Sequence, residues 1–217
     1  RLGMVGGGQG AFIGAVHRIA ARIDDEWELV AGALSSTPEK ALASGKELGL
    51  PEDRIYLSYE EMANAEASRD DGIDAVAIVT PNHMHAGPAV AFLNAGINVI
   101  CDKPLSNDMD GAHAIADAVE DSGKHFVLTH NYTGYPLIRV AKDMVAGGDL
   151  GSIRFVAAEY IQDWLTKEAD PDNKQAAWRM DPARAGAGGC IGDIGTHAFN
   201  LVSFVTGLEV SEISGEL

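Results

Sequence analysis

The sequence predicts an α/β protein: a doubly wound parallel Rossmann sheet, followed by the start of a second domain that contains a strand with one wet face. Three observations support this prediction. Short apolar runs alternate with helical patterns over residues 1–130, which is typical of right-handed βαβ units. A glycine-rich turn follows the first apolar run. After residue 130 this alternation stops, and residues 153–164 alternate polar with apolar, as in a strand with one wet face.

The acidic composition limits the partners of the protein. The 217 residues carry 32 acidic and 16 basic side chains, a formal net charge of −16, which disfavours nucleic acid and anionic membranes. No apolar run approaches the roughly 20 residues of a membrane span. No signal peptide is visible and the first residue is not Met, so we expect a trimmed N-terminus and a cytoplasmic protein. Cys101 and Cys190 lack metal-site spacing and are expected to be reduced, buried apolar residues.

The first strand, residues 2–5, leads into a glycine turn and then a helix over residues 12–23. Gly6, Gly8 and Ala11 fit the G-x-G-x-x-A fingerprint of dinucleotide-binding Rossmann domains. The first glycine makes the tight turn, the second lets the backbone approach a pyrophosphate, and the small third residue lets helix and strand pack closely. The positive end of the helix dipole then faces the phosphates.

The second strand, residues 28–34, bears on the choice between NAD and NADP. The fingerprint expects an acid after this strand to hold the ribose hydroxyls of NAD. The sequence instead reads Ser35-Ser36-Thr37-Pro38, with Lys40 just beyond. Hydroxyls and a nearby lysine tolerate a 2′-phosphate, so the sequence leaves NAD and NADP both open.

The rest of the first domain continues the alternation of helices and strands. Ser58 is expected to cap a helix, with Glu61 completing a capping box. A brief strand at 55–57 raises the expected number of strands to six. The other expected helices are 38–48 (ended by Gly49), 86–94 (closed by Gly96) and 108–121 (ended by Gly123), and the other expected strands are 75–79, 97–100 and 125–129.

Polar residues follow two of these strands, where parallel sheets bind ligands. After residues 75–79 comes Thr80-Pro81-Asn82-His83-Met84-His85. Asn82 and His85 would hydrogen-bond a ligand, or serve only as turn and cap residues, and these residues alone leave both roles open. A metal site at His83 and His85 is disfavoured because no acid or third histidine lies nearby in the sequence.

Lys103 follows the strand at 97–100, between Asp102 and Pro104. The proline cannot continue the strand and restricts the backbone of Lys103. Taken alone, Lys103 is best interpreted as a surface lysine at a strand exit.

The second domain is expected to begin at residue 131. A helix at 135–146 precedes the long strand at 153–164, a polar loop at 166–175 and a flexible run at 186–189. A helix at 198–205 follows, and residues 210–217 begin a further strand. Because one strand and the start of another cannot form a stable sheet, we interpret the chain as a piece of a longer protein, with domains at 1–130 and 131–217.

Asp193 and His197 are four residues apart at the start of a helix, which places them on one face. A carboxylate in this position orients an imidazole and stabilises its cation, as a general base requires. A dipole-stabilising Asp beside an exposed His is the simpler reading of the pair alone. Together with Lys103 and the dinucleotide turn, hydride transfer becomes the better hypothesis. His197 would take the hydroxyl proton and Lys103 would stabilise the alkoxide or carbonyl oxygen.

The whole chain resembles the Gfo/Idh/MocA family, named after glucose-fructose oxidoreductase, inositol 2-dehydrogenase and a rhizopine-catabolism protein. The glycine turn at 6–10 matches, and residues 80–85 match the T-P-N-x-x-H motif of the family. Asp102-Lys103-Pro104 matches its E-K-P motif, with Asp in place of Glu. Trp178-Arg179 matches its W-R motif, and residues 188–197 match G-G-x-x-x-D-x-G-x-H.

The resemblance implies an NAD(P)-dependent dehydrogenase or reductase acting on the CH–OH group of a sugar, anhydrosugar or inositol-like polyol. It implies a cis Lys103–Pro104 bond, an α+β second domain with a mostly antiparallel open sheet, and a homodimer or homotetramer at full length. Lys103, Asp193 and His197 would be catalytic. The cofactor would contact Gly6, Gly8, Gln9, Gly10, Ala11, Phe12, Ile13, Ser35, Thr80, Pro81, Asn82, His85, Asp102, Lys103, Trp178 and Arg179. The substrate would contact Lys103, Asn131, Tyr132, Asp163, Trp164, Asp193 and His197.

The alternative function is a non-catalytic sensor of a dinucleotide or sugar with the same fold. Such a protein need not keep a catalytic lysine and histidine, and this chain has both. The enzyme hypothesis depends on the convergence of Lys103, Asp193 and His197 beside one nicotinamide ring.

Overall fold

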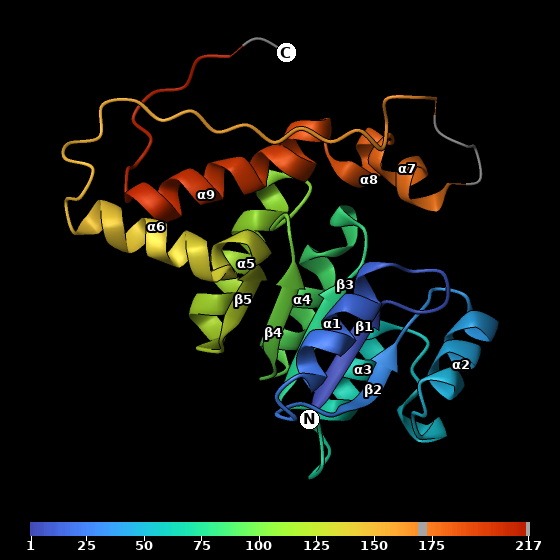
Figure 1. The fold of residues 1–217 in the computed structure, drawn as a ribbon. Helices are drawn as coiled ribbons and strands as arrows, with labels where there is room; N and C mark the ends of the chain where they lie inside the picture. Colours follow the sequence, from blue (N-terminus) through green and yellow to red (C-terminus); the bar gives the residue numbers. More distant parts are fainter. Residues whose placement is uncertain (169–172, 216–217) are drawn as a thin grey trace. The chain divides into compact units, whose positions relative to one another are not determined.

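The computed structural model describes residues 1–168 and 173–215 (Figure 1). The chain divides into two compact units. The first contains Arg1–Thr129 and Asp181–Ala187, and the second contains His130–Met180 and Gly188–Leu217. Among the described residues, no helix is long and apolar enough to cross a membrane.

The first unit is built on a parallel sheet of five strands in the order β2-β1-β3-β4-β5. From β1 the chain moves outward to β2, then crosses to the other side of β1 for β3, so the winding direction switches between β1 and β3. Ligands of open α/β sheets bind at such a switch point, outside the carboxyl ends of the strands. The strands are β1 (Leu2–Gly6), β2 (Leu29–Ala33), β3 (Ala75–Val79), β4 (Asn98–Asp102) and β5 (Phe126–Thr129).

The predicted strand at 55–57 is wrong. Ile55 makes only an isolated parallel bridge to Gly32 of β2. A 3₁₀ turn, η1 (Glu52–Arg54), ends immediately before it, and Ser58 caps a helix immediately after it, so too few residues remain for a ladder. The bridge still occupies the position beyond β2 where dinucleotide-binding sheets have a further strand.

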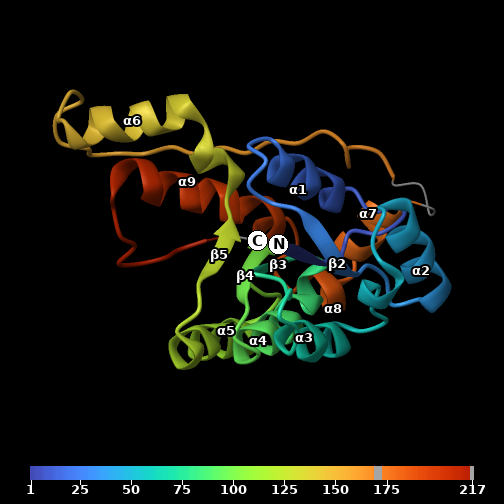
Figure 2. The same ribbon diagram turned by 90° about the horizontal axis from the view of Figure 1, so that it is seen from below.

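Helices cover both faces of this sheet. In Figure 2, α3 (Tyr59–Ala67), α4 (Ala86–Asn94) and α5 (Met109–Ser122) lie on one face and α1 (Ile13–Arg22) lies on the other. Ser58 caps α3 by accepting a hydrogen bond from the backbone N–H of Glu61 (3.1 Å), as predicted. Gly123 ends α5 in the left-handed conformation. The remaining elements are α2 (Pro38–Glu47), the 3₁₀ turn η2 (Asn82–Met84) and α8 (Pro182–Ala185).

The core of the first unit has two layers because β3 is buried on both faces. Val76 and Ile78 pack with Phe92 and Leu93 in one layer. Ala77, in the other layer, packs with residues of β1 and with residues that follow β2. This two-sided burial explains why the sequence of β3 is a continuous apolar run.

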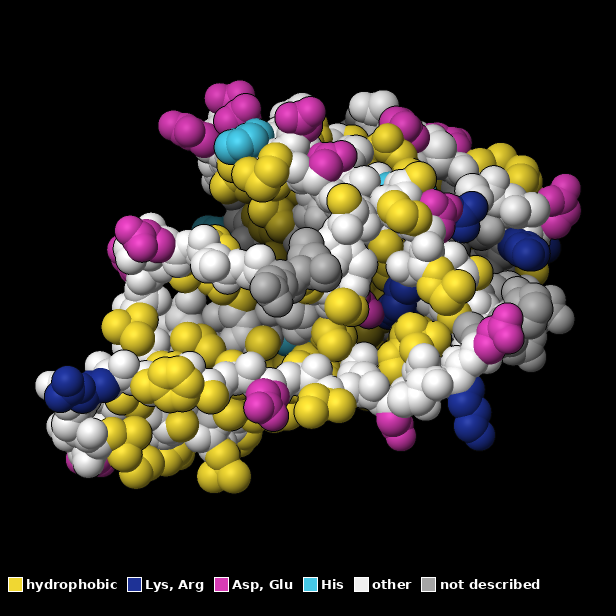
Figure 3. Space-filling model, turned by 90° about the horizontal axis from the view of Figure 1, so that it is seen from above, with side chains coloured by type: hydrophobic (Ala, Val, Ile, Leu, Met, Phe, Trp, Pro, Cys, Tyr) yellow, Lys and Arg dark blue, Asp and Glu magenta, His cyan; other side chains and the backbone are white. Residues whose placement is uncertain are grey.

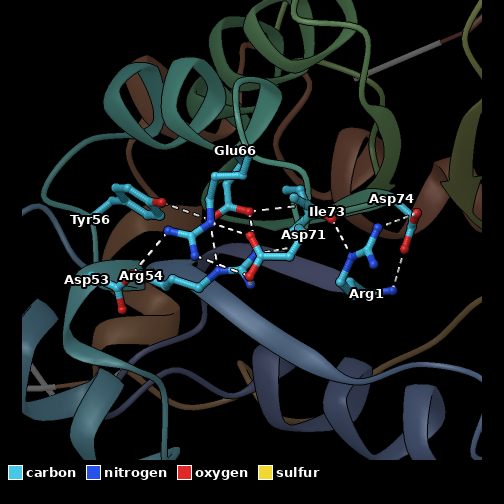
Figure 4. Close-up of polar contacts among 10 residues, drawn as sticks. Arg1, Asp53, Arg54, Tyr56, Glu66, Asp71, Ile73 and Asp74 are labelled. Atoms are coloured by element: carbon cyan, nitrogen blue, oxygen red, sulfur yellow. Dashed lines mark hydrogen bonds and ion pairs between the residues drawn. The ribbon is translucent and has the colours of Figure 1, made fainter.

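A buried ionic network surrounds Glu66 of α3 (Figure 4). The carboxylate of Glu66 accepts hydrogen bonds from Arg54 Nε (3.1 Å), Tyr56 Oη (2.7 Å) and the backbone N–H of Ile73 (3.1 Å). A further short contact joins Arg54 Nη2 to the same carboxylate. Because the donors satisfy the buried charge, the network joins α3 to the segments on either side of it.

The second unit is mainly helical over the described residues. Its elements are the 3₁₀ turn η3 (Asn131–Gly134), α6 (Pro136–Ala146), α7 (Lys174–Arg179), the π-helical turn η4 (Ile191–Gly195) and α9 (Thr196–Thr206). Helix α6 packs against α9. The helix predicted over residues 198–205 is confirmed as α9, which begins two residues earlier, at Thr196, and ends one residue later.

The predicted strands of the second unit are wrong over the described residues. Residues 153–163 join no ladder, and neither do residues 210–215; residues 216 and 217 lie outside the described part. A strand needs a lateral partner for its backbone groups, and the described chain supplies none here. Phe155 and Ile161 are each 86% exposed as a result, and Figure 3 shows hydrophobic side chains uncovered on the face drawn there. Of the predicted loop 166–175, residues 169–172 lie outside the described part and α7 begins at Lys174.

Candidate active site

The glycine turn after β1 has the backbone conformation that its sequence predicts. Gly6, Gly7 and Gly10 have φ angles of 80°, 73° and 77°, a region that favours glycine. A Cβ atom on Gly8 would lie 2.6 Å from the carbonyl oxygen of Leu34, so this position also has to be glycine. The turn is therefore a tight, glycine-dependent loop at the carboxyl end of β1.

The fingerprint predicted that helix and strand pack closely at Ala11. In the structure the close approach is between Gly14 of α1 and Gly7 of the turn. Ala11 lies in the loop before α1, whereas Gly14 is buried in the first turn of that helix. A Cβ atom on Gly14 would lie 2.4 Å from the Cα of Gly7. The sequence signal was a glycine within an amphipathic helix, where glycine is otherwise unfavourable.

The turn and α1 fit the pyrophosphate of a dinucleotide. The first turn of α1 has no acidic residue, and among the described residues no side chain caps its N-terminus. The positive end of the helix dipole is thus available to an anion. Ser44, which sequence reasoning missed, braces the turn because its Oγ accepts a hydrogen bond from the backbone N–H of Gln9 (3.0 Å).

The end of β2 has no carboxylate for a ribose. Ser35 is half-buried, and its Oγ accepts a hydrogen bond from the backbone N–H of Thr37 (3.1 Å). Lys40 is exposed on α2. These residues are compatible with either NAD or NADP.

The polar side chains of Asn82 and His85, after β3, lie against backbone carbonyl oxygens of the first unit. Asn82 is 3% exposed, and its Nδ2 donates to the carbonyl oxygen of Ala185 (3.0 Å). His85 is fully buried, with Nδ1 2.7 Å from the carbonyl oxygen of Pro104 and Nε2 3.0 Å from that of Thr80. Burial lowers the pKa of His85, although the two carbonyl oxygens and Asp102 act in the opposite direction. Neither side chain caps η2 or α4, and Asn82 bonds instead to Ala185, far away in the sequence. Direct ligand contacts of Asn82 and His85 stay a prediction.

His83 and His85 differ in their surroundings. His83 is exposed whereas His85 is buried. Among the described residues, no group of three or more histidine, cysteine, aspartate or glutamate side chains is arranged to hold a metal ion.

Lys103 is half-buried immediately after β4, and its bond to Pro104 is cis, as the family resemblance implies. The preceding Asp102 accepts a hydrogen bond from Thr129 Oγ1 (2.9 Å) and lies 3.9 Å from Nε2 of His17. Burial alone would raise the pKa of Asp102, but His17 and Thr129 outweigh it and hold the pKa below its ordinary value. The hydrogen bond between Asp102 and Thr129 therefore links the last residue of β4 to the last residue of β5.

The second unit carries His197 at the start of α9, among aromatic rings. Its ring centroid lies 4.8 Å from that of Tyr132, 5.9 Å from that of Tyr160 and 6.1 Å from that of His130. The Oη atoms of Tyr132 and Tyr160 are 2.5 Å apart, and this hydrogen bond raises the pKa of Tyr132 to about 12. The Tyr132 phenol therefore stays neutral at physiological pH.

A cavity of about 490 Å³ lies within the second unit beside His197. Two predicted site residues, His197 and Tyr132, line it. Sequence reasoning missed Tyr160, for which the only signal was the alternating pattern of residues 153–164. The other lining includes Val156, Ala158, Leu201, Val202 and Val205.

Asp193 lies in the π-helical turn η4, a feature that is frequent at functional sites. Its Oδ2 accepts a hydrogen bond from Arg179 Nε (2.9 Å). Arg179 was predicted to contact the cofactor, and the structure gives it this carboxylate partner. Among the predicted substrate residues, Asn131 and Asp163 are exposed and Trp164 is 40% exposed.

The structure thus brings predicted residues together within each unit. In the first unit Gly6, Thr80 and Lys103 follow or end the adjacent strands β1, β3 and β4, at one edge of the sheet. In the second unit Asp193 and His197 lie in consecutive turns of one helical segment. The convergence of Lys103 with Asp193 and His197 joins the two units and stays a prediction.

Comparison with known proteins identifies the family of the chain. The fold and the glycine turn define a dinucleotide-binding Rossmann domain in the first of the two units. Residues 1–130 match the model of an oxidoreductase family with an NAD-binding Rossmann fold, and residues 138–217 match the GFO/IDH/MocA C-terminal domain. The chain therefore belongs to the Gfo/Idh/MocA family, which confirms the resemblance.

Three relatives show how far the similarity extends. The levoglucosan dehydrogenase of Pseudarthrobacter phenanthrenivorans is 32% identical, covering 100% of this chain and 53% of that protein. A crystal structure of an oxidoreductase from Sinorhizobium meliloti is 55% identical with a TM-score of 0.84, covering 97% of this chain and 53% of that one. An inositol dehydrogenase homologue from Azotobacter vinelandii, complexed with NAD+, is 36% identical with a TM-score of 0.91, covering 94% and 53%. This chain spans about half the length of such relatives.

Proposed function

We propose that the protein carrying this chain is an NAD(P)-dependent oxidoreductase that transfers hydride between a nicotinamide cofactor and a CH–OH group. The observation that carries the proposal is the glycine turn at the switch point of the sheet. Gly6, Gly8 and Gly14 let the backbone and the N-terminus of α1 come close to a pyrophosphate. When bound, the oxidised nicotinamide supplies the hydride acceptor.

Three side chains of this chain would act on the hydroxyl group of the substrate, by removing its proton and by stabilising its oxygen. His197 takes the hydroxyl proton, and the C–H hydride leaves as the C=O bond forms. Lys103 donates a hydrogen bond to the oxygen while negative charge develops on it. Asp193 stabilises the imidazolium that His197 becomes. This assignment requires Lys103 of the first unit and His197 of the second to act on one substrate molecule.

The substrate class in this proposal is a sugar, an anhydrosugar or an inositol-like polyol. The support comes from relatives named as a levoglucosan dehydrogenase and as an inositol dehydrogenase homologue. The rings of Tyr132, Tyr160 and His197 in the second unit provide aromatic faces and polar tips, which suit a ring bearing hydroxyl groups.

The test is a steady-state assay of the complete protein with NAD and with NADP over a panel of monosaccharides, levoglucosan and inositols. We expect turnover with at least one member, and a loss of about a hundredfold or more in kcat for Lys103→Ala and for His197→Asn. Binding of dinucleotide by both variants should persist. Tight dinucleotide binding without turnover of any substrate would instead indicate a sensor and would overturn the proposal.

A further inference from the structure

Arg179 of α7 and Asp193 of η4 form an ion pair within the second unit. Arg179 Nε donates to Asp193 Oδ2 at 2.9 Å. The two side chains are only 25% and 18% exposed, so water screens the pair less than it would on an open surface. The contact joins two segments that are fourteen residues apart in the sequence.

The guanidinium of Arg179 is also fixed on its other sides. Its Nη1 donates to the carbonyl oxygen of Gln175 (3.1 Å) and to the Oε1 of the same residue (2.8 Å). The guanidinium carbon lies 4.2 Å from the ring centroid of Trp178 and 5.6 Å from that of Trp164. With its plane stacked and two of its nitrogens bonded, the guanidinium is preorganised to hold a carboxylate.

We propose that Arg179 is a positioning residue that fixes the carboxylate of Asp193 for the reaction proposed above. A charge-assisted hydrogen bond holds that carboxylate in one orientation. Asp193 in turn precedes His197 by one helical turn, so its orientation determines how it stabilises the imidazolium of His197. Arg179 therefore acts through Asp193, and the inference rests on the proposed function.

The alternative role for Arg179 is direct contact with the dinucleotide, and the two roles predict different kinetics. A residue that acts through Asp193 lowers kcat when it is replaced and leaves the dissociation constant of the dinucleotide unchanged. A residue that binds the dinucleotide raises that dissociation constant. The two roles also differ in the double variant. If Arg179 acts through Asp193, replacing both residues should lower kcat little more than replacing Asp193 alone, because the effects of residues that act as one unit do not add.

The experiment compares the complete wild-type protein with Arg179→Met, Arg179→Lys, Asp193→Asn and the double variant Arg179→Met/Asp193→Asn. For Arg179→Met we expect kcat to fall about tenfold to a hundredfold, the size expected for losing one hydrogen bond to a charged group. The dissociation constant of NAD, from fluorescence titration, should change by less than about twofold. The double variant should be no more than about twofold slower than Asp193→Asn alone.

Chemical rescue and a matched arginine complete the design. Ethylguanidinium should restore part of the activity of Arg179→Ala and none of that of Asp193→Asn. Arg69 is the control, because its Nε also donates to an aspartate, Asp71 (2.7 Å), in the first unit. Arg69→Met should keep the wild-type kcat. Arg179→Lys covers the case in which Arg179→Met fails to fold, and it should lose kcat because one ammonium cannot replace the planar fork.

Several outcomes would overturn the inference. These are an unchanged kcat in Arg179→Met, a raised dissociation constant of NAD at constant kcat, multiplicative losses in the double variant, or no rescue of Arg179→Ala. If the wild type itself turns over no substrate, the proposed function fails, and the inference fails with it. A normal wild type beside a normal Arg179→Met variant rejects the inference alone.

Discussion

The Nδ1 atom of His85 lies 2.7 Å from the carbonyl oxygen of Pro104, the residue that follows Lys103. The Nε2 atom of the same ring lies 3.0 Å from the carbonyl oxygen of Thr80. Thr80 immediately follows β3, and Pro104 lies just beyond the end of β4. His85 therefore joins the segments that leave two adjacent strands, one of which carries Lys103.

Replacing His85 should destabilise the first unit. His85→Leu fills the same buried space but removes the hydrogen bond that the neutral imidazole donates to one of these two carbonyl oxygens, at a cost of about 2 kcal/mol in the free energy of unfolding. Urea unfolding measures this cost. The neighbouring His83 is exposed and serves as the control, because His83→Leu should change the free energy by no more than about 0.5 kcal/mol. Equal effects of the two replacements would contradict the role given to His85.

His85 should also make stability depend on pH. Burial holds its pKa in the folded state below the ordinary value of 6.5. Below about pH 6.5 the unfolded chain therefore binds a proton that the folded chain does not. The free energy of unfolding should decrease as the pH falls from about 7 to about 5, and His85→Leu should show a smaller decrease. Urea titrations at several pH values measure both slopes, and identical slopes would show that His85 titrates alike in both states.

Glu66 is expected to be a sensitive position for stability. Glu66→Gln leaves the 5% exposed Arg54 without its carboxylate and should cost about 3 kcal/mol. The double variant Arg54→Met/Glu66→Leu should recover part of this loss, because it leaves no buried charge unpaired although Tyr56 Oη and the N–H of Ile73 lose their acceptor. Asp53→Asn breaks the exposed pair with Arg69 and should cost less than about 1 kcal/mol. Thermal unfolding ranks the variants, and a double variant as unstable as Glu66→Gln would contradict this account.

Local sequence patterns predicted most of the first unit. The apolar runs of β1 and β3 identify strands buried on both faces, and Ser58 and Gly123 define helix ends through their own backbone chemistry. The strand at 55–57 could not be distinguished from a bridge, because apolar character does not report whether a neighbouring ladder has room to form. The alternation of 153–164 is likewise a valid strand pattern, but a strand also requires a partner.

The candidate site was harder to predict because its contacts are long-range. Sequence spacing suggested that Asp193 serves His197, but it gave no sign that Arg179 holds Asp193 across fourteen residues. The motif around His85 left ligand contacts and turn-and-cap roles both open, and it gave no sign that the two ring nitrogens lie beside backbone carbonyl oxygens of Pro104 and Thr80. Which polar atoms remain available to a ligand depends on packing, and packing is not visible in a motif.

At Gly14 the effects of packing and of helix propensity on stability are expected to have opposite signs, so Gly14→Ala tests which of them is larger. In an exposed helix, Gly→Ala stabilises a protein by about 0.4–1 kcal/mol. At Gly14 the added Cβ would lie 2.4 Å from the Cα of Gly7, a contact that forces α1 away from the turn. Gly14→Ala should therefore lower the melting temperature and weaken the binding of NAD by about tenfold or more, because the turn and the helix N-terminus hold the pyrophosphate together. Gly134→Ala is the control, since a methyl group there meets no atom within 4 Å. A Gly14→Ala variant that is more stable than wild type and binds NAD normally would show that helix and turn do not need this close approach.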